Sequence, residues 1–307
     1  MEVVIAITLP IFLVVGLGFG VTRAGLFSVP DMRIFGRFVI SIALPALLFN
    51  AIAKRDVAEV FDPVFMGIYA GVSLCALAIA YVWFCHVRGM PLERAGICMM
   101  GVACSNSGYM SFPILLLAFP DLAAKVLAMC LLVENLLMIP TVLVLIALGR
   151  GRGAGMIWGI ARDLLRRPLI LALIAGLVWS VFKLPIPAVL DQGLGMISTA
   201  AVALALFVVG GSLAGVSLRG NLGLASQISV GKLVLHPLLA LGVLAVAGAG
   251  LSPELQACLL IACAVPMLGV YPIFAQEQGM EGLASLALLM TTAMSFFTLS
   301  LALVFLM

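Results

Sequence analysis

Two proline-containing segments could bind an ion, the first with polar side chains and the second mainly with backbone groups. CSNSGYMSFP spans Cys104 to Pro113 and AVPMLGVYP spans Ala264 to Pro272, each within an apolar run long enough to cross a bilayer. Proline removes a backbone donor and disfavours helix at the residue before it, so each segment should interrupt its helix. In hydrocarbon a spanning helix is broken only where the freed backbone groups are buried in protein or face a polar cavity. The two segments therefore predict a binding site within the membrane.

The helix ends at these breaks are suited to charged ligands. We expect the first broken helix to restart around Ser111 to Pro113, where its free N–H groups would carry about half a positive charge and accept an anion. If the two breaks cross near the bilayer midplane, two helix ends suit an anion, and two ends with exposed carbonyls suit a cation. Kinked helices that serve packing alone are the alternative, because Gly and Pro are common in membrane spans. The candidate binding residues are Asn106, Ser107, Gly108, Ser111, Pro113, Pro266, Met267, Gly269 and Pro272.

Three ionisable residues lie inside other apolar runs, where each charge needs a partner or a role. Lys232 and His236 are four residues apart and share a helical face. Lys232 is a candidate to bind a substrate carboxylate, or else it pairs with Glu134 or with a carbonyl at a helix break. Glu134 is a candidate coupling residue because a carboxyl in a low dielectric can exchange protons near neutral pH. His236 is a second coupling candidate, with helix packing as its alternative.

The composition sets the class of protein. Of 307 residues, 64% are hydrophobic and 9% are charged, against roughly 25% charged in an average soluble domain. The chain is therefore expected to be an integral protein of the lipid bilayer, with no nucleic-acid partner. Its 7 cysteines form no CxxC pair, and no HExxH, GxSxG or phosphate-loop motif is present, so we expect no enzyme, no metal site and no cofactor. A coupling ion, either H⁺ or Na⁺, remains open.

A membrane span needs about 20 mostly apolar residues, and the sequence predicts ten of them. The predicted ranges are 3–20, 36–53, 63–86, 93–119, 125–148, 167–183, 194–216, 224–249, 254–276 and 283–306. A polar connection divides them into a first five-helix repeat over 1–149, a cytoplasmic linker over 150–166 and a second repeat over 167–307. Because five is odd, the halves enter the membrane from opposite sides. An inverted repeat is also indicated by Pro91 and Pro253, which each open the fourth span of their half.

Loop charges predict the orientation of the chain. The odd-numbered connections carry Arg23, Arg33, Arg37, Arg88, Arg94, Arg150, Arg152, Arg162, Arg166, Arg167 and Arg219, and the even-numbered ones carry Lys54, Arg55, Lys125 and Lys183. Positive residues concentrate on the cytoplasmic side. Both termini are therefore expected on the non-cytoplasmic side of the inner (plasma) membrane. The ninth connection is an exception, since it carries Glu277 and Glu281 without a Lys or Arg.

Three stretches give the chain a family resemblance. NSGYMSFPIL from Asn106, KLVLHPLLA from Lys232 and AVPMLGVYPIFAQEQG from Ala264 resemble the auxin efflux carrier family. That family includes plant auxin exporters and bacterial permeases for malonate, malate and similar acids. The resemblance implies a fold like that of sodium–proton antiporters and bile acid symporters, with crossed fourth and ninth spans. It also implies a scaffold or dimerisation part, hence a homodimer, and elevator-type alternating access.

The resemblance also assigns individual residues. Asn106 matches the asparagine that contacts substrate at the first crossing, and Pro113, Pro266 and Pro272 match the crossing prolines. Plant auxin carriers have an Asn on each side of the proline that opens the sixth span, whereas here Arg167 and Leu169 flank Pro168. We therefore expect a secondary active transporter of small organic anions, with malonate or a similar dicarboxylate favoured. The alternatives are a carrier of auxin or another monocarboxylate, or a channel or receptor on the same fold.

Overall fold

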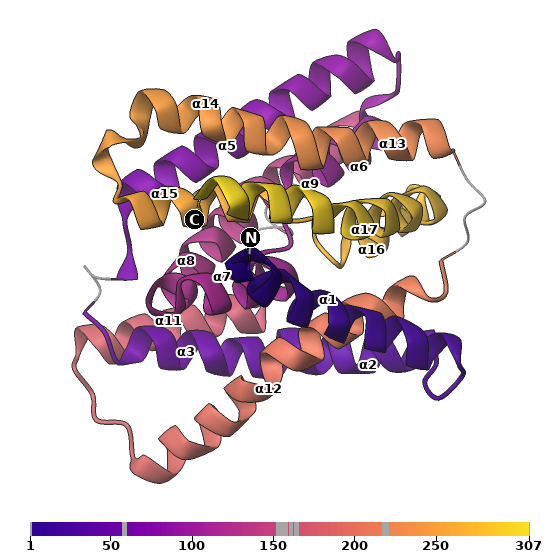
Figure 1. Cartoon of the computed structure of the whole chain (residues 1–307). Coiled ribbons are helices and arrows are strands. Elements are labelled where there is room, and N and C mark those ends of the chain that lie inside the picture. The colour runs from indigo at the N-terminus through magenta and orange to yellow at the C-terminus, as the bar shows by residue number, and fades with distance from the viewer. Residues whose placement is uncertain are drawn as a thin grey trace.

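The computed structural model describes residues 2–56, 60–151, 159, 162, 166–216 and 221–306. These residues are helical apart from short connections, and they form no β-strand. Their one isolated β-bridge joins Ser105 to Met267. The prediction of an all-helical protein is therefore confirmed for the described part of the chain (Figure 1). Most of the predicted linker over 150–166 lies outside the described residues.

Seven helical stretches among the described residues are long and apolar enough to cross a membrane. They are α1 (Glu2–Arg23); α2 (Val29–Phe38) with η1 (Val39–Ala43) and α3 (Leu44–Ala53); α5 (Pro63–Tyr81) with η2 (Val82–Val87); α8 (Pro120–Val133) with η4 (Glu134–Met138) and α9 (Ile139–Gly149); α12 (Ala188–Leu213); α13 (Leu222–Val230) with η5 (Gly231–Leu235), α14 (His236–Ala247) and η6 (Gly248–Gly250); and α17 (Glu281–Leu306). This set makes the chain a multi-pass membrane protein.

The other three predicted ranges contain shorter apolar helices. These are α6 (Leu92–Ala103) followed by η3 (Ser107–Ser111) and α7 (Phe112–Ala118); α11 (Pro168–Val181); and α15 (Pro253–Ala264) followed by α16 (Tyr271–Gln276). The helices are interrupted at both proline-containing segments, between Ala103 and Ser107 and between Ala264 and Tyr271.

Prolines widen four of the helices locally. The π-helical turns η1, η3, η4 and η5 each end two residues before a proline, namely Pro45, Pro113, Pro140 and Pro237. A proline ring clashes with the preceding turn of a regular α-helix, and a π-helical turn gives the chain room at that point. The same turns carry Ser107, Glu134 and Lys232. The sequence therefore opens the helix backbone where these three polar side chains sit.

The helices form two packing groups. In the first group α12 packs on α1, α2 and α3, and α11 packs on α3. In the second, α5 packs on α6 and α14, and α17 packs on α13, α15 and α16. Figure 1 shows α1, α2, α3 and α12 on one side of the molecule and α5, α13, α14 and α15 on the other. The helices α7 and α8 and the turn η3 lie between them, since they contact members of both groups.

Glycines set the close approach of α1 to α12. A Cβ atom at Gly210 would overlap the carbonyl of Val15, and one at Gly18 would overlap the carbonyl of Phe207. By contrast, Gly16 and Gly20, which form a GxxxG pair in the sequence, have open space around their Cα atoms. The helices therefore pack through Gly18 and Gly210, where backbone meets backbone.

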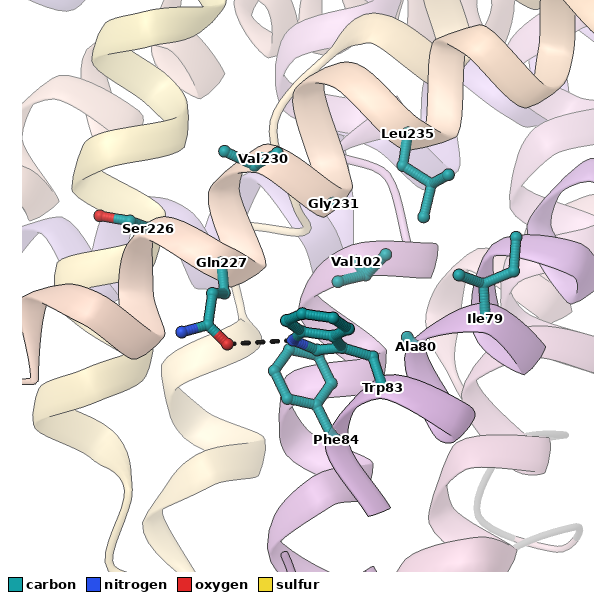
Figure 2. A pocket seen from close by; sticks show the side chains of 10 residues that line it. All are labelled: Ile79, Ala80, Trp83, Phe84, Val102, Ser226, Gln227, Val230, Gly231 and Leu235. Carbon is teal, nitrogen blue, oxygen red and sulfur yellow. Dashed lines mark hydrogen bonds between the residues drawn. The ribbon is translucent and has the colours of Figure 1, made fainter. Parts of the chain in front are cut away.

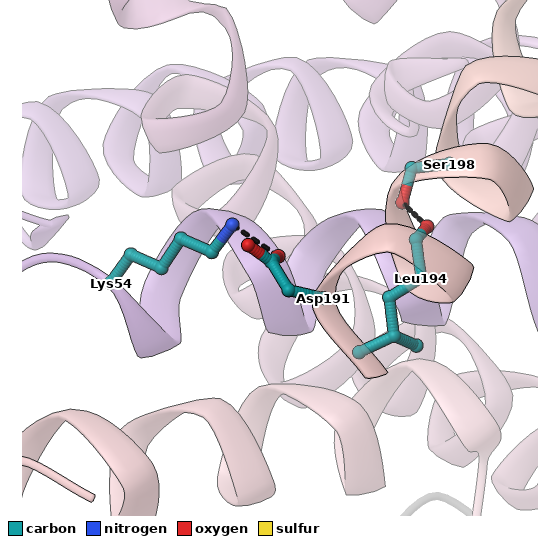
Figure 3. Close-up of polar contacts among 4 residues, drawn as sticks. All are labelled: Lys54, Asp191, Leu194 and Ser198. Carbon is teal, nitrogen blue, oxygen red and sulfur yellow. Dashed lines mark hydrogen bonds and ion pairs between the residues drawn. The ribbon is translucent and has the colours of Figure 1, made fainter. Parts of the chain in front are cut away.

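Ion pairs join the connections at the ends of the helices in two separate sets. The acidic ninth connection is neutralised by arginines from the first and fifth, since Glu277 pairs with Arg150 at 3.1 Å and Glu281 with Arg33 at 3.9 Å. The second set links the second and sixth connections, where Lys54 pairs with Asp191 (Figure 3) and Lys183 with Asp56 at 3.8 Å. Each of these four ion pairs joins two odd-numbered or two even-numbered connections. The described ion pairs thus divide the connections into an odd-numbered and an even-numbered group.

A substitution at the contact between α1 and α12 tests this packing. We expect Gly210→Ala to destabilise the protein by about 1–3 kcal/mol or more, because the added methyl group meets backbone that cannot rotate away. Gly20→Ala is the matched control, since its Cβ meets nothing within 4 Å. Melting temperatures in detergent should fall for Gly210→Ala alone. Equal melting temperatures for the two variants would contradict this account.

Candidate functional site

The two helix breaks meet each other inside the protein. The backbone N–H of Asn106 donates to the carbonyl of Pro266 at 2.9 Å, and Ser105 and Met267 form the antiparallel bridge. All four residues are buried. Each break thus supplies backbone partners that the other lost when its helix ended, as hydrocarbon surroundings require.

The first broken helix restarts earlier than the sequence predicted. Asn106 caps η3, with its side-chain oxygen accepting from the N–H of Tyr109 at 3.3 Å. The N–H of Ser111 already donates to the carbonyl of Asn106 at 3.0 Å. The expected restart at Ser111 to Pro113 is therefore wrong, because the widened turn η3 accommodates Pro113 within the second half-helix. The N–H groups at this helix end belong to Ser107 and Gly108 instead.

A small cleft lies beside the crossing. Its volume is about 80 Å³, and Asn106, Ser107, Gly108, Glu134 and Gly269 line it. Asn106 is 4% exposed, and its side-chain nitrogen has no hydrogen-bond partner among the described residues. The absence of a side chain at Gly269 leaves room there, since a Cβ atom would lie 3.6 Å from that nitrogen. An unsatisfied buried donor costs about 1–3 kcal/mol, so this amide is a candidate donor to a ligand.

Glu134 faces the same cleft and is held by hydroxyl groups. Its Oε1 accepts from the Tyr69 hydroxyl at 2.7 Å and from the Ser107 hydroxyl at 2.5 Å. Tyr69 comes from α5 and Ser107 from the first break, so this carboxyl group joins three elements. Since η4 opens the helix at Glu134, the carboxyl group reaches the first break directly.

Arg167 brings a positive charge to the cleft. It is half-buried, lines the cleft and donates from Nη1 to the side-chain oxygen of Asn135 at 2.9 Å. Asn135 is fixed in turn, because its amide nitrogen donates to the carbonyl of Leu131 at 2.9 Å. Arg167 precedes Pro168 and adopts an extended backbone at the start of α11, as residues before proline prefer. The cleft therefore holds a guanidinium, a carboxyl group and an amide donor.

Lys232 lies behind the crossing rather than in the cleft. It is fully buried, and its ammonium donates to the Ser105 hydroxyl at 2.6 Å and to the Cys263 carbonyl at 3.2 Å. It also lies 2.7 Å from Nδ1 of His236, whose Nε2 is 3.2 Å from the Ser73 hydroxyl. Cys263 is in the last turn of α15 and Ser105 follows the end of α6. The ammonium thus occupies the position at the carbonyl ends of the broken helices where a cation was expected.

The structure brings only some of the predicted site residues together. The candidates outside the set that lines the cleft are Ser111, Pro113, Pro266, Met267, Pro272, Lys232 and His236. Tyr69 and Ser105 were not predicted from the sequence, although each binds a buried charged group. Ser105 had a signal, because it lies between two residues of the first break and a buried lysine needs acceptors. Tyr69 had none, since nothing in its own apolar run marks it.

A larger cavity elsewhere is unsuited to an anion. It measures about 360 Å³ and lies between η2 and the helix formed by α13 and η5 (Figure 2). Its lining is almost entirely apolar, and the polar contact across it is the hydrogen bond from the Trp83 indole to Gln227 at 3.0 Å. No charged residue is among the described residues that line it. The small cleft beside the crossing is therefore the candidate functional site.

Comparison with known proteins places the chain in a family. The sequence profile of the membrane transport protein family matches residues 3–303. The chain belongs to this family. The match confirms the resemblance to auxin efflux carriers that the sequence indicated. Family membership also supports the expectation that this membrane transport protein is not an enzyme.

Two curated relatives are also transport proteins. One from Rhizobium meliloti (strain 1021), named "Putative malonate transporter", is 27% identical over 98% of this chain and 95% of its own length. The other, from Methanothermobacter thermautotrophicus (strain ATCC 29096 / DSM 1053 / JCM 10044 / NBRC 100330 / Delta H), is named "Uncharacterized transporter". It is 25% identical over 76% of each chain.

Removing the buried ammonium should destabilise the crossing. We expect Lys232→Met to lower stability by several kcal/mol, because the Ser105 hydroxyl and the Cys263 carbonyl each lose a buried donor at about 1–3 kcal/mol per group. Lys183→Met is the control, since that side chain is 82% exposed. The measurement is the melting temperature of each purified variant. A Lys232→Met protein as stable as the control would show that the ammonium does not hold the two breaks together.

Proposed function

We propose that this protein is a secondary active carrier of small organic anions, with malonate or a similar dicarboxylate as substrate. The observation that carries the proposal is the cleft at the meeting of two broken helices. There Asn106, whose side-chain nitrogen has no hydrogen-bond partner among the described residues, and the guanidinium of Arg167 both line the cleft. Binding sites of secondary transporters are typically formed by such discontinuous helices. The name of the Rhizobium meliloti relative supports malonate.

We also propose that the chain crosses the membrane ten times, as two inverted five-helix repeats. Each of the ten ranges predicted from the sequence contains helix. The separation of the ion pairs by parity supports alternate crossing, because loops on one side of a membrane can pair only with one another. With the arginine-rich connections on the cytoplasmic side, both termini lie outside the cytoplasm. The inner (plasma) membrane is the proposed location.

An elevator mechanism is supported by where the cleft lies. Its wall on one side comes from the first packing group, through Ile40, Leu44 and Leu169. The opposite wall comes from residues of the two breaks and from Glu134 on η4, which lie outside the first group. In the proposal the first group is the static scaffold of a homodimer, and the second moves with the substrate. The cleft then faces alternate sides of the membrane as the groups slide past each other.

The size of the cleft favours a small substrate. The cleft has a volume of about 80 Å³, several times the roughly 10–15 Å³ that one water molecule needs, so it has room for a small acid. Malonate is such an acid, whereas auxin carries an aromatic ring system. The cleft therefore favours the dicarboxylate over the auxin-like alternative.

We propose protons rather than Na⁺ as the coupling ion. Glu134 is a carboxyl group in the cleft that can carry a proton between the two sides. The charged groups near it are Arg167 in the cleft and Lys232 behind the first break, and Tyr69 packs against it from α5. Lys232 already places a positive charge at the helix carbonyl ends, where Na⁺ would otherwise bind. Both observations favour proton coupling.

Asn106 variants test the substrate site. We expect Asn106→Ser to reduce malonate counterflow in proteoliposomes by about tenfold or more, because serine keeps a capping oxygen but lacks the amide donor. Asn221→Ala is the matched control. That residue caps α13 by the same contact, from the N–H of Leu224 at 3.0 Å, and it does not line the cleft. Counterflow also excludes a channel, which would not exchange labelled for unlabelled substrate. Wild-type exchange by Asn106→Ser would remove Asn106 from the site.

Glu134→Gln tests the coupling ion. We expect this variant to keep malonate counterflow but to lose accumulation driven by a pH gradient, since glutamine cannot carry the proton. Replacing Na⁺ by choline should leave wild-type uptake unchanged. Glu281→Gln, at an exposed side chain, should behave like the wild type. Accumulation by Glu134→Gln at the wild-type level would exclude Glu134 as the proton carrier, and a requirement for Na⁺ would exclude proton coupling.

A further inference from the structure

The cleft presents two separate groups suited to carboxylates. One is the side-chain amide of Asn106, which is buried and has no hydrogen-bond partner among the described residues. The other is Arg167, the one cationic side chain among the described residues that line the cleft. They come from different elements, the first helix break and the start of α11. A ligand with an acceptor at each end can bind both groups at once.

Arg167 is held in place for this role. Asn135 fixes the guanidinium through the 2.9 Å hydrogen bond, and the Leu131 carbonyl fixes Asn135 in turn. A guanidinium binds a carboxylate through a planar fork of donors, which gives direction as well as charge. Because the side chain is already oriented, less conformational entropy is lost when the substrate binds.

The surrounding charges explain why an arginine is needed there. Glu134 lines the same cleft, and its carboxyl group disfavours a second negative charge nearby when it is ionised. The neutral amide of Asn106 alone does not balance the two negative charges of a dicarboxylate. The guanidinium provides the opposite charge in the cleft, beside Asn135.

We infer that Arg167 binds the second carboxylate of the substrate and thereby makes the carrier selective for dicarboxylates over monocarboxylates. The inference rests on the proposed function, since it assigns a residue to substrate recognition in the same cleft. Asn106 binds the first carboxylate, which both classes of acid possess. The preference between the classes therefore depends on Arg167.

The test compares malonate with monomethyl malonate, which is similar in shape but has one free carboxylate. We expect the wild-type protein in detergent to bind malonate about tenfold or more tightly than the monoester, as a charge-assisted hydrogen bond provides. In Arg167→Gln the two dissociation constants should become equal through loss of malonate affinity alone. Arg167→Lys should keep part of the preference, because it retains the charge without the fork. Arg166→Gln is the matched control, since Arg166 is the adjacent, exposed arginine.

The possible outcomes separate this inference from the proposed function. If Arg167→Gln keeps the wild-type ratio of the two dissociation constants, or weakens both acids equally, the inference is overturned. If the wild type binds both acids equally well, the inference fails and the proposed anion carrier stands. If the wild type binds neither acid, the proposed function fails and the inference fails with it. Melting temperatures of all variants without ligand separate loss of binding from loss of fold.

Discussion

The arrangement of this protein depends on the need to satisfy every backbone polar group inside a membrane. Two helices end within the apolar interior, and each leaves carbonyl and N–H groups without partners. The hydrogen bond from Asn106 to the Pro266 carbonyl and the bridge between Ser105 and Met267 pair one break with the other. Lys232 then binds at the remaining carbonyl end. Each break therefore depends on the other for backbone partners, and the site combines residues from both halves of the chain.

The prolines connect this backbone constraint to the chemistry of the site. Each π-helical turn that precedes Pro113, Pro140 or Pro237 holds a polar side chain with a buried partner. The first turn directs the Ser107 hydroxyl to the carboxyl group held on the second, and the third carries the ammonium that reaches Ser105. Serines on either side of Asn106 are thus bound to opposite charges. Any movement of the first break therefore changes the contacts of both Glu134 and Lys232.

Much of the fold could be predicted from sequence because apolar run length and proline position act locally. The ten helical ranges and both breaks follow from these two signals. The predicted start of the second half-helix was wrong because a π-helical turn accommodates Pro113. Such a turn depends on hydrogen bonds that local helix propensity does not predict.

The site was only partly predictable for a different reason. Asn106, Glu134 and Lys232 stand out as polar residues in apolar runs, but whether a side chain faces the cleft depends on helix rotation. Lys232 faces the other side of the crossing, and Arg167, considered only as a departure from the plant carriers, faces the cleft.

The charges around the cleft also suggest why one carboxyl group would serve both substrate and proton in the proposed mechanism. An anion that enters beside an ionised Glu134 is repelled, whereas one that enters beside a protonated Glu134 is not. Binding of the anion and binding of the proton therefore favour each other, and thermodynamic linkage makes this effect reciprocal. In the proposed mechanism Arg167 sets this balance, since its positive charge lowers the repulsion between the anion and Glu134 without removing it. With a second cation in the cleft the anion would bind regardless of the proton, and coupling would be lost. Lys232 does not act as this second cation. Its ammonium lies behind the crossing, where it donates to the Ser105 hydroxyl and the Cys263 carbonyl.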